Sequence, residues 1–288
     1  KVKIYQQNAA YPSRVKALVA FLLQEKLQSK QDIKHKLCPD FMGNVPDLWP
    51  HLLNALTESG MATEEDALVS LEKKTPSGYP INKKTVAENF PRLFADFALQ
   101  PNLPNGDENS FATLCAWLLK QDPLSLPSMT PVGKESLIRE METSGVEVAS
   151  LKLNDASIRD NLFTWCNYLG LSSNLYERTI PDPTTFLRWH WESFQKLAKH
   201  GEIGIKDFCS KVAEICPVLD GGTVWEKVRE YEPKYSDSEI SKSLSLSFVR
   251  LESEGYIKCG YLDDAASPSR RYLDHETQIP ITSLKFLK

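Results

Sequence analysis

Long hydrophobic runs are missing from this sequence. No stretch approaches the ~20 continuous apolar residues that a membrane-spanning helix needs. The first residues, KVKIYQQNAAYPSR, lack the apolar segment of a signal peptide. The 6 cysteines are dispersed and none forms a C-x-x-C pair, which favours buried, reduced thiols over a disulfide framework. We therefore expect a cytoplasmic protein that does not associate with membranes.

The common signatures of catalytic and cofactor sites are also missing. The sequence contains no G-x-x-x-x-G-K-[ST] loop, no G-x-G-x-x-G fingerprint and no G-x-S-x-G elbow. Its 5 histidines do not follow a zinc-binding spacing, and its carboxylates are scattered. These absences predict a protein that is not an enzyme and that needs no cofactor and no metal.

Charge is unevenly distributed along the chain. The net charge of −4 argues against a protein coated in nucleic acid. Residues 1–37, however, hold eight Lys and Arg residues against Glu25 and Asp32. Such a segment can attract phosphate groups, or it can simply be a solvated helical surface, and the sequence leaves both interpretations open.

Residues 236–273 have the pattern of a winged helix. Ser236 or Asp237 can cap a helix. The apolar residues that follow recur at helical spacing, and Gly255 can end the helix. A strand at Tyr256–Tyr261 and a second strand at Arg271–Leu273 then enclose a polar loop, which predicts a hairpin. Helix, glycine, strand, loop and strand together indicate a relative of the helix-turn-helix.

The start of the chain repeats this pattern. Pro12 and Ser13 open a helix, Ser29 caps a second one, and a third helix begins at Pro46 and stops at Gly60. Residues 61–71 can form a small two-stranded wing. The phrases LLNALTESGM and SFVRLESEGYI echo each other as hydrophobic helix, acidic residue, glycine and strand.

These patterns predict a mainly α fold with winged helix-turn-helix domains at both ends. We expect the domains to span residues 1–75 and 181–288, with a helical middle region at 76–180. The middle region reads equally well as a degenerate helix-turn-helix or as a plain helical bundle. Within it, helices are expected at 84–99, 110–120, 131–143 and 155–169, and the last domain should begin with a helix at 184–199.

DNA contacts are expected from basic residues of the first domain and from the outward face of the last helix and its wing. Serines and cations on such a face suit contacts with phosphates or base edges. The candidates are Arg14, Lys16, Lys30, Lys34, Lys36, Ser241, Lys242, Ser245, Arg250, Arg270 and Arg271. Residues 235–275 nevertheless hold seven acidic residues against five basic ones, so that module alone should bind DNA weakly. Docking of a protein on the winged helices therefore stays open as the alternative.

One pair of phrases is more distinctive. FTWCNYLGL (residues 163–171) followed by IPDPTTFLRW (residues 180–189), with winged-helix patterns on both sides, resembles accessory proteins of bacterial anti-phage islands, such as the DpdG family of the 7-deazaguanine DNA-modification cluster. The resemblance implies a DNA-associated, non-catalytic component of an antiviral defence complex, with DNA and a partner protein as its ligands. It transfers no catalytic residue, because the sequence holds no catalytic motif to match. The alternative function is a protein–protein adaptor or a scaffold that forms homodimers.

Overall fold

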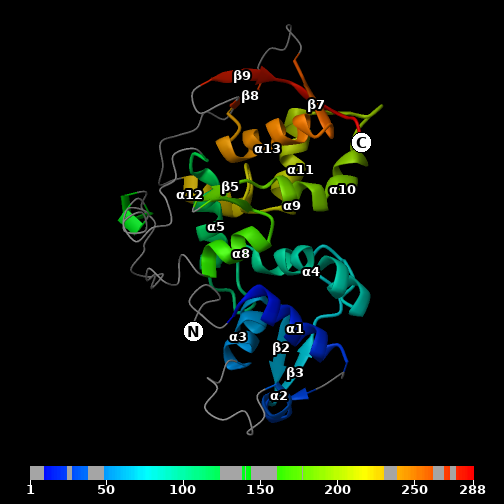
Figure 1. Cartoon of the computed structure of the whole chain (residues 1–288), viewed down its shortest axis with the longest axis vertical. Helices are drawn as coiled ribbons and strands as arrows, with labels where there is room; N and C mark the ends of the chain where they lie inside the picture. The colour runs from blue at the N-terminus through cyan, green and yellow to red at the C-terminus, as the bar shows by residue number, and fades with distance from the viewer. Residues whose placement is uncertain are drawn as a thin grey trace. The chain divides into compact units, whose positions relative to one another are not determined.

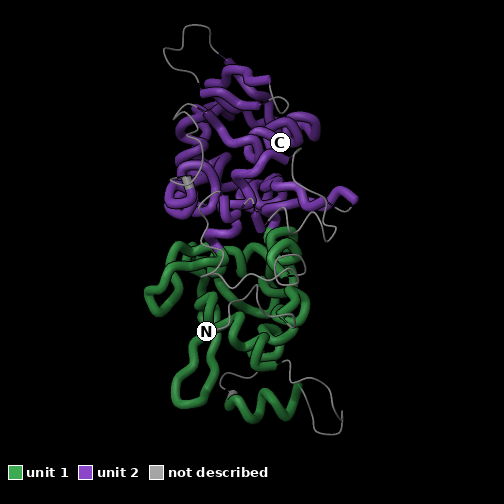
Figure 2. Tube along the Cα trace, turned by 90° about the vertical axis from the view of Figure 1, so that its left-hand side faces the viewer, with its two compact units in different colours: residues 1–111, 152–169 green, residues 112–151, 170–288 purple. Residues whose placement is uncertain are grey.

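The computed structural model describes residues 10–24, 28–37, 49–123, 138–139, 141–143, 161–176, 178–229, 239–261, 269–272 and 277–288. The chain divides into two compact units (Figure 2). Unit 1 comprises Lys1–Phe111 and Lys152–Leu169, and unit 2 comprises Ala112–Leu151 and Gly170–Lys288.

Unit 1 begins with three helices and three short strands (Figure 1). Their order along the chain is α1 (Pro12–Leu22), β1 (Gln28–Ser29), α2 (Lys30–Leu37), α3 (Trp49–Ser59), β2 (Ala62–Glu65) and β3 (Leu68–Leu71). The strands form an antiparallel sheet in the order β1-β3-β2, so the first strand pairs with the last.

Local sequence explains these elements. Pro12 starts α1, where its missing N–H is not needed. The Oγ of Ser29 accepts a hydrogen bond from the backbone N–H of Asp32 at 3.0 Å, as the predicted cap of α2 should. Gly60 follows α3 with a φ of +83°, which confirms the predicted stop. Apolar residues of α1 and α3 are buried, and the two helices contact each other and the small sheet.

A long helix and a distant short helix complete unit 1. In α4 (Lys83–Ala98), the Asn82 side chain accepts from the backbone N–H of Thr85 at the N-terminus. Phe94 of α4 stacks on Trp165 of α8 (Phe163–Tyr168), with ring centroids 4.7 Å apart. The Trp165 indole N–H also donates to the carbonyl of Ala10 at 2.9 Å. Aromatic packing therefore holds α8 in a unit whose other elements lie far earlier in the sequence.

Unit 2 repeats the strand order of unit 1. The helix α5 (Ser110–Lys120) leads into it, and its later elements include three small sheets among the described residues. These elements are β4 (Ser172–Leu175), β5 (Arg178–Pro181), α9 (Thr184–Trp189), α10 (Trp191–Gln195), β6 (Glu202–Gly204), α11 (Ile205–Ile215), α12 (Thr223–Arg229), α13 (Lys242–Ser253), β7 (Ile257–Gly260), β8 (Ser269–Tyr272), β9 (Gln278–Ile281) and β10 (Ser283–Phe286). The three-stranded sheet has the order β6-β10-β7, again with the first strand beside the last. The other two sheets are the hairpins β4-β5 and β8-β9.

Aromatic residues form the core of unit 2. Phe208 of α11 lies between Phe194 of α10 and Phe248 of α13, with centroid distances of 4.7 and 5.7 Å. Trp191 packs edge-on against Tyr256 and Phe286, which brings α10 to the three-stranded sheet. The helices α10, α11 and α13 therefore share one core with that sheet.

The mainly α prediction is wrong, since the described residues form a mixed α/β structure with four small sheets. Two of the strands, β1 and β6, have only 2 and 3 residues. Such strands are too short to show an alternating pattern in the sequence. The domain limits at residues 75 and 180 stay predictions.

Three finer expectations also need correction. The strand β7 pairs with β10 instead of with the strand containing Arg271, which is β8 and pairs with β9. Ser241 caps α13 by accepting from the N–H of Leu244 at 3.1 Å, whereas the expected caps Ser236 and Asp237 lie outside the described residues. The helix expected at 184–199 is divided at His190 into α9 and α10.

Other expectations fall partly outside the description. The expected start of the third helix at Pro46 lies outside the described residues. Most residues of the helices expected at 131–143 and 155–169 also lie outside them. Within those two spans, residues 138–139, 141–143 and 163–168 are helical. The helices expected at 84–99 and 110–120 are confirmed as α4 and α5 within one residue at each end.

Candidate nucleic-acid interface

The helix α13 does not present its serines to solvent. Ser241 is 1% exposed, and Ser245 and Ser247 are 0% exposed. Ser241 donates two hydrogen bonds to the Asp220 carboxylate, from its backbone N–H at 2.7 Å and from its hydroxyl at 2.8 Å. The Ser245 hydroxyl accepts from the N–H of Tyr272 in β8 at 3.0 Å. The expected outward orientation of these serines is therefore wrong, because each hydroxyl is used inside unit 2.

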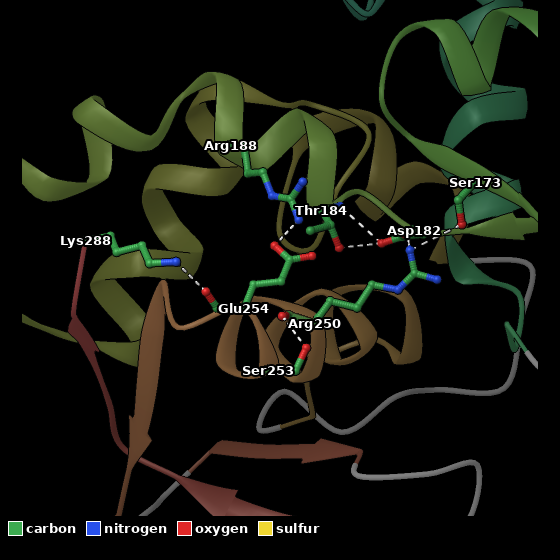
Figure 3. A network of polar contacts seen from close by, with 8 residues as sticks. All are labelled: Ser173, Asp182, Thr184, Arg188, Arg250, Ser253, Glu254 and Lys288. Atoms are coloured by element: carbon green, nitrogen blue, oxygen red, sulfur yellow. Dashed lines mark hydrogen bonds and ion pairs between the residues drawn. The ribbon is translucent and has the colours of Figure 1, made fainter.

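The two cations of α13 form ion pairs within unit 2. Lys242 pairs with Asp122, and both side chains are about one-fifth exposed. Arg250 pairs with Asp182, which follows β5 (Figure 3). The Asp182 carboxylate also accepts from the Thr184 hydroxyl, and the Arg250 guanidinium reaches the Ser173 hydroxyl at 3.5 Å. These contacts place polar groups of α13 against the β4-β5 hairpin and the start of α9.

The neighbouring arginines of β8 differ in their surroundings. Arg271 is 5% exposed and forms an ion pair with Glu252 at 2.8 Å. Arg270 is exposed. Successive residues of a strand point to opposite faces, so only Arg270 is presented to solvent.

Basic side chains of unit 1 are more accessible. Arg14 of α1 and both Lys34 and Lys36 of α2 are exposed. The Lys36 ammonium lies 5.6 Å from the ring centroid of Phe21, which brings the end of α2 close to α1. These three cations are the candidates of unit 1 that remain most open to a polyanion.

Lys30 and Lys16, the other two candidates of unit 1, are also in contact with neighbouring groups of the protein. Lys30 forms an ion pair with Glu64 of β2, and each side chain is a little over one-third exposed. The Lys16 ammonium donates to the carbonyl of Ala87 in α4 at 2.8 Å. A cation held by one carbonyl can still face an anion, because that bond leaves its charge unneutralised.

Sequence reasoning missed two exposed lysine pairs in unit 1. Lys73 and Lys74 follow β3, and Lys83 and Lys84 begin α4. The doubled lysines are visible in the sequence, but they lie outside the segments that the sequence patterns predict to contact DNA. It also missed the tip of the β4-β5 hairpin, where Leu175 is 54% and Tyr176 97% exposed.

A small hollow lies in unit 1. A hollow lined by Glu58, Leu103 and Phe111 has a volume of about 30 Å³, enough for roughly one water molecule. Over the described ranges, no three His, Cys, Asp or Glu residues gather as a metal site would require. Nor, within those ranges, does any helix combine the length and apolar character that a bilayer span demands.

The last two residues of the first distinctive phrase, Gly170 and Leu171, contact the second phrase within unit 2. The Phe186 backbone N–H donates to the Gly170 carbonyl at 3.1 Å, and the Asp182 N–H donates to the Leu171 carbonyl at 3.0 Å. Gly170 has a φ of +71°, and a Cβ there would lie 2.8 Å from the Phe186 nitrogen. The side chain of any other residue would clash with the Phe186 backbone, which explains why position 170 is a glycine.

Comparison with protein families gives a match to the DpdG-like model over residues 2–265. The chain belongs to the DpdG-like family. The resemblance inferred from the sequence phrases is thereby confirmed. Membership of the DpdG-like family suggests an accessory role in a DNA-modification system. Searches of curated proteins and of solved structures found no match.

Proposed function

We propose that this chain is a non-catalytic accessory protein that binds DNA through a winged helix in unit 1. The order α1-β1-α2-α3-β2-β3 and the strand order β1-β3-β2 support the winged-helix assignment. The observation that carries the DNA assignment is the exposure of Arg14, Lys34 and Lys36 on α1 and α2. The DpdG-like family gives this surface a context, since a protein of a DNA-modification system works beside DNA.

Phosphate contacts would supply most of the binding free energy. Each neutralised phosphate releases condensed counterions, so the affinity falls as the salt concentration rises. Each contact adds about −0.9 to the slope of log K against log salt concentration. Three contacts predict a slope of about −2.7 in a plot of log K against log salt concentration. The chain as a whole carries a net charge of −4, so attraction to DNA depends on local basic surfaces such as this one.

In unit 2, the polar groups of α13 would stabilise the fold instead of contacting DNA. The strand order β6-β10-β7 repeats that of unit 1, but α13 commits Ser241, Ser245, Lys242 and Arg250 to contacts inside the unit. These internal contacts disfavour insertion of α13 into a major groove. Arg270 remains as the exposed cation through which β8 would add a phosphate contact.

Charge reversal tests this function. The double variant Lys34→Glu and Lys36→Glu should bind a labelled random-sequence duplex at least roughly tenfold more weakly than the unmodified chain at low salt. The matched control is Lys206→Glu with Lys285→Glu, which makes the same charge change at exposed positions of unit 2. Equal affinity of the α2 variant and the unmodified chain would exclude the α2 surface from the interface.

A second function, self-association, is favoured by the β4-β5 hairpin. Tyr176 is 97% exposed and adopts a φ of +53°, which is unfavourable for a bulky residue. Tyr and Arg are among the residue types enriched at interface hot spots. Tyr176 and Arg178 are both exposed, and a symmetric contact would place the Tyr ring of one copy against the Arg guanidinium of the other.

Sedimentation equilibrium tests this second function. The unmodified chain should show concentration-dependent dimers, and Tyr176→Asn should remain monomeric over the same range. Asn tolerates positive φ, so this change keeps the turn intact. The variant Asp66→Asn, at a positive-φ position in the β2-β3 turn, is the control and should dimerise normally. A chain that stays monomeric at every concentration would rule out the scaffold function.

A further inference from the structure

We propose that unit 1 carries a second phosphate-binding surface, formed by Lys16, Lys73, Lys74, Lys83 and Lys84, which we call the lysine knuckle. The proposal rests on the proposed DNA function and extends its interface to residues outside α2. Its ligand is the phosphate backbone of duplex DNA. Of these five lysines, only Lys16 is among the DNA contacts predicted from the sequence.

The backbone of a tight turn brings the two lysine pairs together. Lys74 and Pro80 form an antiparallel bridge, and the Ile81 N–H donates to the Lys73 carbonyl at 2.9 Å. The stem that carries Lys73 and Lys74 therefore lies beside residues 80 and 81. Lys83 and Lys84 follow that stem directly, as the first two residues of α4.

A fifth ammonium joins them from α1. The Lys16 Nζ lies 2.8 Å from the carbonyl oxygen of Ala87. Ala87 is three residues after Lys84 and four after Lys83, and residues at these spacings are neighbours on a helix surface. The Lys16 charge therefore lies within about one helical turn of the Lys83 and Lys84 backbone.

This arrangement is unfavourable for folding. The N-terminus of a helix carries a partial positive charge, so a cation in its first turn is repelled. The first turn of α4 contains no acidic residue, and Lys83 and Lys84 occupy it together. Among the described residues, none of Lys73, Lys74, Lys83 and Lys84 forms an ion pair, and all four are exposed.

The acidic residues nearby leave an excess of positive charge. Glu72 precedes the first lysine pair and Glu88 lies one turn into α4, and both are exposed. Five ammonium groups against two carboxylates give the knuckle a local charge opposite in sign to that of the whole chain. A bound polyanion would relieve the repulsion among these lysines and with the helix N-terminus.

The turn is held in one shape by buried contacts. Thr75 is 4% exposed, and its N–H donates to the Tyr79 carbonyl at 2.8 Å. The Arg92 guanidinium carbon lies 4.0 Å from the centroid of the Tyr79 ring, and Arg92 also donates to the Tyr79 hydroxyl. A preordered turn lowers the entropic cost of placing several charges against a ligand.

A polyanion fits the knuckle better than a small phosphate compound. A small-molecule site is concave and encloses most of its ligand. The four paired lysines instead lie on an open surface, spread over the stem of a turn and the start of a helix. Such a surface suits a strand of regularly spaced phosphates.

The test uses the full chain with Lys83→Glu and Lys84→Glu. Acidic residues in the first turn of α4 favour the helix, so the melting temperature should stay the same or rise. Affinity for a random-sequence duplex should nevertheless fall by roughly tenfold or more at low salt, and the salt slope should become shallower by about 1.8 for two lost contacts. The variant Lys73→Glu with Lys74→Glu should weaken binding similarly, without changing α4.

The outcomes separate this proposal from the proposed function. If reversal at Lys34 and Lys36 weakens binding while both knuckle variants bind normally, the knuckle proposal is wrong and the DNA function stands. If the unmodified chain binds no duplex even at low salt, both are wrong. Loss of affinity in a knuckle variant with unchanged or higher melting temperature supports the knuckle as a contact surface, because misfolding cannot explain that combination.

Discussion

Arg250 of α13 forms an ion pair with Asp182, whose side chain is only 4% exposed (Figure 3). The two residues lie 68 positions apart in the sequence. Their contact joins the helix expected to read DNA to the segment between β5 and α9. A cation that the sequence suggests for DNA is therefore used to hold parts of unit 2 together.

Removal of this carboxylate should destabilise the protein. Asp182→Ala deletes the partner of Arg250 and the acceptor for both the hydroxyl and the backbone N–H of Thr184. Because Arg250 is 40% exposed and can be hydrated, we expect a loss of about 1–3 kcal/mol in the free energy of unfolding. Urea denaturation measures this loss.

The exposed ion pair of Arg188 and Glu254 provides the control. Its side chains are 35% and 38% exposed, so Glu254→Ala should cost less than about 1 kcal/mol. Equal losses for the two variants would mean that the Asp182 contact contributes no more than a surface pair.

The two arginines of β8 should respond differently to substitution. Arg271→Ala breaks a mostly buried ion pair with Glu252 and should lower the free energy of unfolding by about 2 kcal/mol. Arg270→Ala should leave stability within about 0.5 kcal/mol of the unmodified chain. It should instead make the salt slope of DNA binding shallower by about 0.9. Thermal melts and duplex titrations of both variants check this split, and loss of stability in Arg270→Ala would contradict it.

Asp220 should make stability depend on pH. Burial raises the pKa of the Asp220 carboxyl above its ordinary value of 3.8, although hydrogen bonds from Ser241 oppose the shift. The folded state therefore binds this proton more tightly than the unfolded state does. Its contribution to the free energy of unfolding is fully present below pH 3.8 and is lost as the pH rises through the folded-state pKa.

The variant Asp220→Asn isolates this contribution, because its amide cannot ionise. The free energy of unfolding of Asp220→Asn relative to the unmodified chain should increase with pH above 3.8, by up to about 1.4 kcal/mol per pH unit. Urea denaturation at a series of pH values measures the difference. A difference that stays constant with pH would show that the pKa of Asp220 is the same in both states.

The thiol of Cys259 should react slowly in the folded protein. Burial is the main cause that raises its pKa from 9.0 to about 12. At pH 8 the reactive thiolate should therefore be about 1,000-fold scarcer than in an ordinary cysteine. A thiol reagent such as Ellman's should modify Cys259 only after denaturation, as mass spectrometry of the labelled peptide would show. Rapid labelling of the native chain at this residue would contradict the assignment.

Helices with a clear apolar face were predictable from the sequence. The apolar spacing in α1, α3 and α13 indicates helices, and the glycines that follow α3 and α13 mark their ends. The strands β1 and β6 were not predictable, because they owe their existence to pairing with β3 and β10. The pairing of β7 with β10 was missed for a related reason, since an inserted hairpin separates the two strands in the sequence.

The candidate site shows a sharper limit of sequence reasoning. A serine in a helix reads as a polar, outward residue, yet Ser245 is completely buried because its hydroxyl satisfies the N–H of Tyr272. Arg270 and Arg271 are identical residue types, and only the strand geometry separates an exposed cation from a buried one. The basic character of residues 30–36 was visible in the sequence, and the structure places Lys34 and Lys36 on the surface.

The salt dependence of duplex binding shows whether unit 1 contacts DNA phosphates. Titration of the full, unmodified chain into a labelled random-sequence duplex over a series of salt concentrations gives the slope of log K against log salt. We expect binding at micromolar concentration or below at low salt, with a slope of about −2.7 or steeper from at least three phosphate contacts. No binding at low salt, or an affinity that does not change with salt, would contradict the proposal that unit 1 binds DNA through its exposed cations.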